Sequence, residues 1–133
     1  MKRHGRVAIR GPKGILVVAK PGHAFNLPGG KAEKGENQLE AAGRERKQEL
    51  GKRVKLSRLR FHSDHLEAKF EGGKRSSREF HRVYTATLRK NGVPKPRHEI
   101  KKMAWVNRAN LSKTKLAFPA NYVVPKLLGR KWK

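Results

Sequence analysis

Hydrophobic and polar positions alternate over several short segments of this chain, and one longer segment repeats its apolar positions with the period of a helix. Alternation and β-branched residues predict strands. We expect these strands at residues 6–10, 14–20, 54–62, 66–70, 79–88 and 101–106. The "GPKG" stretch after the first strand is typical of a turn, so the chain is expected to begin with a β-hairpin. "EGGKRSSR" is expected to connect the strands at 66–70 and 79–88.

A helix is predicted from about residue 38 to residue 50. Asn37 can cap its first turn with Glu40 at the capping-box position, and Gly51 follows where a helix commonly ends in glycine. Its apolar residues share a face that suits the core: Leu39, Ala42 and Leu50.

A second, short helix is predicted near the C-terminus, in "NYVVPKLLGRKWK". Pro125 interrupts the helix-like apolar spacing there, and proline suits the first turn of a helix better than its middle. The chain has 133 residues and no internal repeat or linker, which indicates one compact domain.

Basic residues dominate the composition. The chain has 34 Lys and Arg against 10 Asp and Glu, a formal net charge of +24, whereas a small soluble domain usually carries a net charge of about 2 to 8. A polyanion would relieve the repulsion, so we expect non-specific binding to nucleic acid at low salt. The alternative is a solvated basic surface without a partner, whether natural or made by deliberate recharging.

Several protein classes are excluded or disfavoured by what the sequence lacks. Without cysteine there are no disulfides and no Cys-ligated zinc sites. No apolar run approaches the roughly 18 residues of a membrane span, and the first residues lack the apolar core of a secretory signal. A soluble intracellular protein, most simply a cytoplasmic one, is expected.

The few carboxylates are concentrated in one region. Five of the ten acidic residues lie between residues 27 and 52. Glu45 and Glu49 stand one helical turn apart on the same face, with Gln48 beside them. Spacing alone is equally compatible with a solvated charged face.

The order of residue types around these carboxylates resembles the Nudix box. That pattern is Gly, five residues, Glu, seven residues, Arg-Glu, an aliphatic residue, any residue, Glu-Glu, any residue, Gly and an aliphatic residue. The matching positions are Gly30, Glu36, Arg44, Glu45, Glu49 and Gly51. The preceding "NLPGG", which contains Gly29, is a common lead-in to the box. Since the strands on both sides also resemble those of a Nudix domain, the resemblance implies a single Nudix domain over residues 1–133. Its fold class would be α+β, with a mixed β-sheet between helices.

The resemblance also implies an activity. Nudix enzymes hydrolyse a nucleoside diphosphate linked to another group, using Mg²⁺ or Mn²⁺ held by glutamates of the box. By position, Glu45 and Glu49 would bind the metal and take part in catalysis, and the Gly30 carbonyl would be a further ligand. Glu99, outside the box, is another candidate for the metal or the water.

Other box residues are implied to have a supporting role. Glu36 and Arg44 would brace the loop–helix–loop, and Gly29 and Gly51 would shape its turns. Arg44 is also a candidate member of the catalytic set.

Three positions of the box depart from the pattern: Arg46, Gln48 and Lys52. Gln48 replaces a glutamate, so it keeps an oxygen that could bind the metal but loses the charge, which should weaken metal affinity. Two functions therefore stay open. One is a pyrophosphohydrolase acting on a nucleotide, and the other is a Nudix-fold RNA-binding or ribonucleoprotein component with a vestigial site.

Substrate candidates lie near both ends of the domain. "AFPAN" resembles the loop before the last helix in the oxidised-purine nucleotide hydrolases of this family, so Asn121 is expected either to read a purine edge or to cap the helix. Phe25 and Phe118 are expected either to stack on a base or to belong to the core. The histidines show no metal-binding spacing and are expected to be structural or surface residues: His4, His23, His62, His65, His81 and His98.

Overall fold

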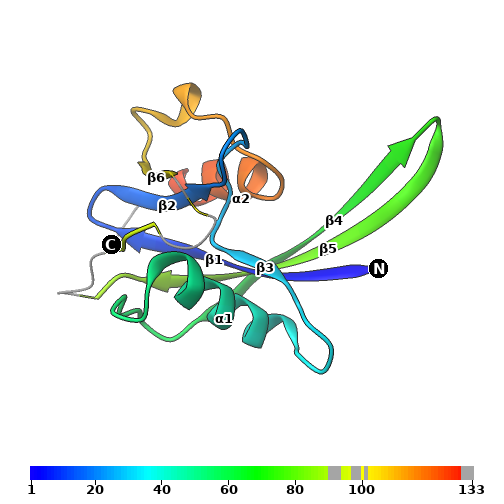
Figure 1. Cartoon of the computed structure of the whole chain (residues 1–133). Helices are drawn as coiled ribbons and strands as arrows, with labels where there is room; N and C mark the ends of the chain where they lie inside the picture. Colours follow the sequence, from blue (N-terminus) through cyan, green and yellow to red (C-terminus); the bar gives the residue numbers. More distant parts are fainter. Residues whose placement is uncertain (90–93, 97–99, 101, 130–133) are drawn as a thin grey trace.

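A computed structural model of the chain describes residues 1–89, 94–96, 100 and 102–129. It contains a six-stranded sheet and two α-helices (Figure 1). In chain order the elements are β1 (Lys2–Gly11), β2 (Gly14–Ala19), β3 (Gly29–Lys31), α1 (Gln38–Leu50), β4 (Arg60–Glu71), β5 (Lys74–Thr87), β6 (Lys102–Val106), the 3-10 helix η1 (Leu111–Lys113) and α2 (Ala120–Leu128).

The sheet is mixed, with strand order β4-β5-β1-β2-β6 and with β3 paired to β1. β1 and β5 run parallel, and the other pairs are antiparallel. β4 and β5 continue beyond the body of the sheet as a long two-stranded arm (Figure 1). The predicted α+β class, a mixed sheet between helices, is confirmed.

Each face of the sheet packs against one helix, because alternate residues of a strand point to opposite faces. Val7 and Ile9 of β1 belong to the apolar cluster that includes Ala42 of α1. Ala8, between them, belongs to the cluster that includes Val123 of α2. Two core layers therefore lie on either side of β1, the central strand.

Close contact between α1 and β1 depends on Gly5. A Cβ atom at Gly5 would overlap the Gln38 carbonyl oxygen and come within 2.9 Å of the Ala42 backbone nitrogen. The Gln38 side chain also donates a hydrogen bond of 3.0 Å to the His4 carbonyl oxygen. The first turn of α1 is thereby held directly on the sheet.

The predicted bounds and cap of α1 are confirmed. Asn37 Oδ1 accepts the Glu40 N–H at 2.8 Å, and Glu40 Oε1 accepts the Asn37 N–H at 3.0 Å. The predicted core position of Leu39 is wrong, because Leu39 is 46% exposed. Gln38 occupies the inward face instead, and the inward-facing positions follow from it at helical spacing: Gln38, Ala42, Glu45 and Glu49.

Three strand predictions need correction. A single strand, β4, replaces the two expected at 54–62 and 66–70, and bulges after Phe61 and Lys69 absorb its irregular pattern. The expected connection "EGGKRSSR" shortens to a turn at Gly72–Gly73, where positive φ angles of 56° and 78° suit glycine. β3 is absent from the predicted strands, because its three residues include two glycines and carry no alternation signal.

The C-terminal helix begins earlier than predicted. α2 starts at Ala120, so Pro125 lies inside the helix rather than in its first turn. The helix continues past the proline because its apolar side chains are buried against the sheet: Val123, Val124, Leu127 and Leu128. Neither described helix has the length and hydropathy of a membrane-spanning segment.

Replacing Gly5 should disrupt the docking of α1. We expect Gly5→Ala to lower the free energy of unfolding by about 3 kcal/mol or more, because the added methyl meets backbone atoms that cannot rotate away. Gly43→Ala is the matched control. Nothing lies within 4 Å of a Cβ there, so it should raise stability by roughly 0.5 to 1 kcal/mol. Urea unfolding of both variants tests this, and equal effects would contradict the described packing.

Candidate active site

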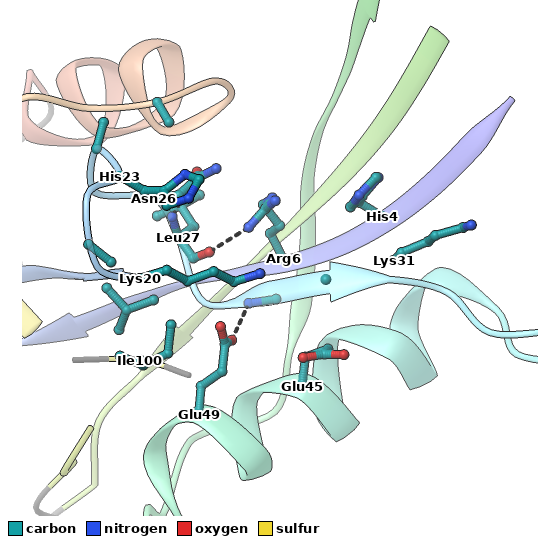
Figure 2. Close-up of a pocket in the computed structure, with 16 residues that line it drawn as sticks. His4, Arg6, Lys20, His23, Asn26, Leu27, Lys31, Glu45, Glu49 and Ile100 are labelled. Atoms are coloured by element: carbon teal, nitrogen blue, oxygen red, sulfur yellow. Dashed lines mark hydrogen bonds between the residues drawn. The ribbon is translucent and has the colours of Figure 1, made fainter. Parts of the chain in front are cut away.

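A cavity of about 400 Å³ opens between β3, the end of β2 and the inward face of α1 (Figure 2). Glu45 and Glu49 rise into it from α1, and Gly29 and Gly30 of β3 form the facing wall. A helix places residues four apart on one face. The two carboxylates therefore reach the same cavity because α1 is held against the sheet.

The glycine pair and the glutamate pair are in direct contact. Glu49, 5% exposed, accepts the Gly29 N–H on Oε1 at 2.7 Å. A Cβ at Gly30 would come within 2.8 Å of Glu45 Cδ and Cγ. The absence of a side chain at position 30 thus makes room for the Glu45 carboxylate.

Arg44 braces the other side of this arrangement. Its guanidinium donates two hydrogen bonds to the Glu36 carboxylate, at 2.8 and 3.0 Å, and a third to Glu45 Oε1 at 2.7 Å. Hydrogen bonding from Arg44 lowers the pKa of Glu36 below its usual value. Hydrogen bonding to Glu36 likewise raises the pKa of Arg44. A permanently charged fork therefore joins the loop before α1 to the metal-site candidate Glu45.

The rest of the cavity wall is rich in basic side chains. Arg6 lies deep in the wall, where its guanidinium donates to the Leu27 carbonyl oxygen at 2.9 Å. Lys20 extends across the cavity, and Lys31 lies beyond Glu45 (Figure 2). Burial lowers the pKa of Arg6, and nearby glutamate carboxylates oppose that shift. This wall suits a polyanionic ligand such as a phosphate chain.

The donor set fits a hard divalent cation. Mg²⁺ and Mn²⁺ prefer oxygen ligands, and the wall offers two carboxylates and the strand that carries the Gly30 carbonyl. The cationic side chains opposite would bind the oxygens of a ligand rather than the ion itself.

Two other residues of the box lie away from this donor set. Gln48 is exposed and is not among the side chains that line the cavity. Gly51 ends α1 at a positive φ of 93°, where its N–H donates to the Lys47 carbonyl oxygen. Glu99 lies outside the described residues, although the buried Ile100 next to it lines the cavity.

The substrate candidates lie outside the cavity wall. Asn121 is exposed at the second position of α2, whose N-cap is Pro119 and has no side-chain cap hydrogen bond. Phe25 packs against the α2-side core. The Phe118 ring is edge-on to His81 and Tyr122, with centroids 5.4 and 5.8 Å apart. Asn26, for which the sequence carried no signal, does line the cavity. Its side-chain amide donates to the Phe118 carbonyl oxygen at 2.8 Å.

A buried polar cluster brings together two of the histidines that the sequence left apart. His4 and His81 pair across the parallel strands β1 and β5, and their rings stack with centroids 4.4 Å apart. Glu79 lies 3.8 Å from His4 Nε2 and 3.4 Å from His81 Nε2. Parallel pairing of two distant strands creates this cluster, so no local spacing could reveal it.

His4, Glu79 and His81 have their potential ligand atoms within 4.8 Å of one another, but the arrangement does not suit a metal ion. The ring planes differ by only 16°, so their in-plane lone pairs do not converge on one point. Arg6 Nε donates to His81 Nδ1 at 3.0 Å, which leaves the proton of the neutral ring on Nε2, the atom nearest Glu79. The near-parallel rings and the Arg6 hydrogen bond favour a structural role for the cluster over a metal site.

Stability should fall as the pH drops below the ordinary histidine pKa, because the two buried rings resist protonation in the folded state. Burial lowers the pKa of His4 to about 4 and of His81 to about 3, against about 6.5 in an unfolded chain. Between these values the unfolded state binds more protons, so stability is fully present above about pH 6.5 and is lost towards pH 4, by up to about 1.4 kcal/mol per pH unit for each histidine.

Urea unfolding between neutral pH and about pH 4.5 measures this loss. His81→Asn should reduce the dependence on pH, whereas His23→Asn, which removes an exposed histidine, should preserve it. The same pH dependence in His81→Asn and the unaltered chain would contradict the expected burial of a neutral imidazole.

Comparisons with known proteins identify the class of protein that this fold and site define. The NUDIX domain matches residues 3–127, so the chain belongs to the NUDIX domain family. It is a hydrolase that acts on pyrophosphate bonds of nucleotide derivatives, and hydrolases of this family typically use divalent cations. Curated protein sequences contain no match to the chain.

Three solved structures illustrate the similarity. A nudix hydrolase family member from Chromobacterium violaceum is 28% identical with a TM-score of 0.72, covering 96% of this chain and 76% of that one. The MutT protein from Bacillus halodurans is 20% identical with a TM-score of 0.76, covering 98% and 84%. An Ap4A hydrolase from C. elegans is 18% identical with a TM-score of 0.65, covering 97% and 91%. The last two likenesses concern the fold alone.

Proposed function

We propose that this hydrolase cleaves a nucleoside triphosphate or another nucleoside diphosphate derivative, with Mg²⁺ or Mn²⁺ held by Glu45 and Glu49. The observation that carries the proposal is that both carboxylates enter one cavity whose wall also carries Arg6, Lys20 and Lys31. A bound divalent cation would neutralise phosphate charge and activate water.

The side chains of the cavity divide this work. Arg6, Lys20 and Lys31 bind and orient the phosphate oxygens, since they line the cavity beside the carboxylates. Arg44 keeps Glu45 directed at the cavity through its 2.7 Å hydrogen bond. The proton of the attacking water passes to a carboxylate of the set, for which Glu45, Glu49 and Glu99 are the candidates.

Removing either carboxylate charge should abolish most of the turnover. We expect Glu45→Gln and Glu49→Gln to lower kcat/KM for release of phosphate or pyrophosphate by about 100-fold or more, since each loses a charged metal ligand or proton acceptor. Glu71→Gln is the control, because Glu71 is an exposed residue of the β4–β5 arm. Assays on a nucleotide panel, with and without Mg²⁺ or Mn²⁺, test this. Absence of cation-dependent turnover in the unaltered chain would contradict the proposal.

A second candidate function is an RNA-binding or ribonucleoprotein component whose site is vestigial. The missing charge at Gln48 and the net charge of +24 favour it. If the site still binds a cation, Gln48→Glu should strengthen Mn²⁺ binding about two- to fivefold, through the added charge beside Glu49. Titration followed by NMR tests this, and no shift at residues 45 to 49 at millimolar metal would favour the vestigial function.

Oxidised purine nucleotides are the proposed substrates. Asn121 is the candidate reader of the base, since its side chain does not cap α2, and it lies outside the wall that carries Glu45 and Glu49. If its amide pairs with a purine edge, Asn121→Ala should reduce discrimination between oxidised and normal purine nucleotides by roughly 1 to 3 kcal/mol. Kinetics on a matched nucleotide pair, measured beside thermal stability, decide the question. Unchanged discrimination would remove Asn121 from the substrate site.

A further inference from the structure

A second cationic surface lies outside the cavity, where α1 ends and the chain leads into β4. The segment between Glu49 and Asp64 contains no acidic residue. Hydrogen bonds bring two other parts of the chain to it: the Arg89 N–H donates to the Lys55 carbonyl oxygen at 2.8 Å, and the Lys95 N–H to the Leu50 carbonyl oxygen at 3.4 Å. We call the exposed cations of this surface the basic edge: Lys47, Lys52, Arg53, Lys55, Arg58, Arg60, Arg89 and Lys95.

Lys55 and Arg89 show how closely the charges are gathered. Leu56 and Leu88 pair as an antiparallel bridge, and both pack against the α1-side core. Their neighbours Lys55 and Arg89 are also opposite one another and are both exposed. Because alternate residues point to opposite faces, these two cations share the outward face. Like charges directly opposite one another destabilise a strand pair unless an anion lies between them.

Among the described residues, no carboxylate is paired with these charges, although ion pairs with carboxylates occur at Arg44, Lys69 and Arg82. None of the eight side chains lines the cavity that holds Glu45 and Glu49. The basic edge is therefore separate from the proposed hydrolytic site.

The edge strand β4 also carries an exposed aromatic ring. Phe61 follows Arg60 at the start of β4 and is 58% exposed. The Arg82 guanidinium carbon lies 5.4 Å from the centre of the Phe61 ring. Cations that follow a phosphate backbone, together with an aromatic ring that can stack on a base, are the combination that binds single-stranded nucleic acid without sequence preference.

We propose that the basic edge binds single-stranded nucleic acid, with its cations on the phosphates and Phe61 against a base. The site goes beyond the proposed hydrolysis and does not depend on it. An anionic lipid surface would use the same cations, but it gives no role to a single aromatic ring beside them. A duplex, whose bases are stacked internally, gives Phe61 no role either.

Two triple variants with the same change in net charge test the location of binding. Arg53→Gln, Lys55→Gln and Arg89→Gln together remove part of the basic edge. Lys113→Gln, Lys115→Gln and Lys126→Gln together remove three exposed cations of η1, its flank and α2. Fluorescence anisotropy with labelled short oligouridylate and oligothymidylate, over a range of salt concentrations, measures affinity.

We expect the basic-edge triple variant to lose about tenfold or more in affinity, and the slope of log K against log salt to fall by about 2, as three phosphate contacts would give on a single strand. The α2-side triple variant should lose less than about threefold. Equal losses in the two variants, or none in either, would overturn the proposal in favour of diffuse charge.

Phe61→Ala tests the base contact, with Phe70→Ala as its control because Phe70 is 61% exposed near the far end of the arm. Phe61→Ala should lower affinity for the single strands and not for a duplex, and Phe70→Ala should lower neither. Binding to anionic phospholipid vesicles is the remaining measurement. If the basic-edge variant loses vesicle binding while it keeps oligonucleotide binding, the partner is a lipid surface and the proposal fails.

Cation-dependent turnover of nucleotides should be unchanged in the basic-edge triple variant, because none of its three positions lines the cavity. If turnover fell together with oligonucleotide binding, these residues would belong to the hydrolytic site. The proposal of a separate binding surface would then be wrong. Failure of the hydrolysis itself, with oligonucleotide binding intact at the basic edge, would instead count only against the proposed enzyme function.

Discussion

The contact between the two glycines of β3 and the two glutamates of α1 is the constraint on which this site depends. Gly29 donates its N–H to Glu49 at 2.7 Å, and the absence of a Cβ at Gly30 leaves room for Glu45. That contact requires α1 to lie close to β1, which the glycine at position 5 permits. Backbone packing, rather than side-chain flexibility, thus sets the distance between the carboxylates and the facing wall.

Charge is distributed unevenly around that contact. The carboxylates of the site face a wall that carries Arg6, Lys20 and Lys31, and much of the remaining surface is basic. A divalent cation bound by these carboxylates would link them to the phosphate oxygens of a ligand. The same positive field would also draw in polyanions that never enter the cavity, so small-molecule turnover and nucleic-acid binding need separate surfaces to be compatible.

Local signals in the sequence predicted local structure well. The helix bounds and capping box follow from side-chain chemistry within one turn, and the box spacing predicted that Glu45 and Glu49 would share a face. Prediction was weaker where distant segments decide the outcome. Leu39 is exposed because the face covered by the sheet begins at Gln38, and the stacking of His4 on His81 requires the parallel pairing of β1 with β5.

Direct location of the metal tests the central claim. A crystal soaked with Mn²⁺ should give an anomalous-scattering peak within about 2.3 Å of carboxylate oxygens of Glu45 and Glu49, and the peak should vanish in crystals of the doubly substituted Glu45→Gln, Glu49→Gln chain. A peak at His4, Glu79 and His81 instead, or no peak in the cavity at millimolar Mn²⁺, would contradict the assignment of this cavity as the cation-dependent hydrolytic site.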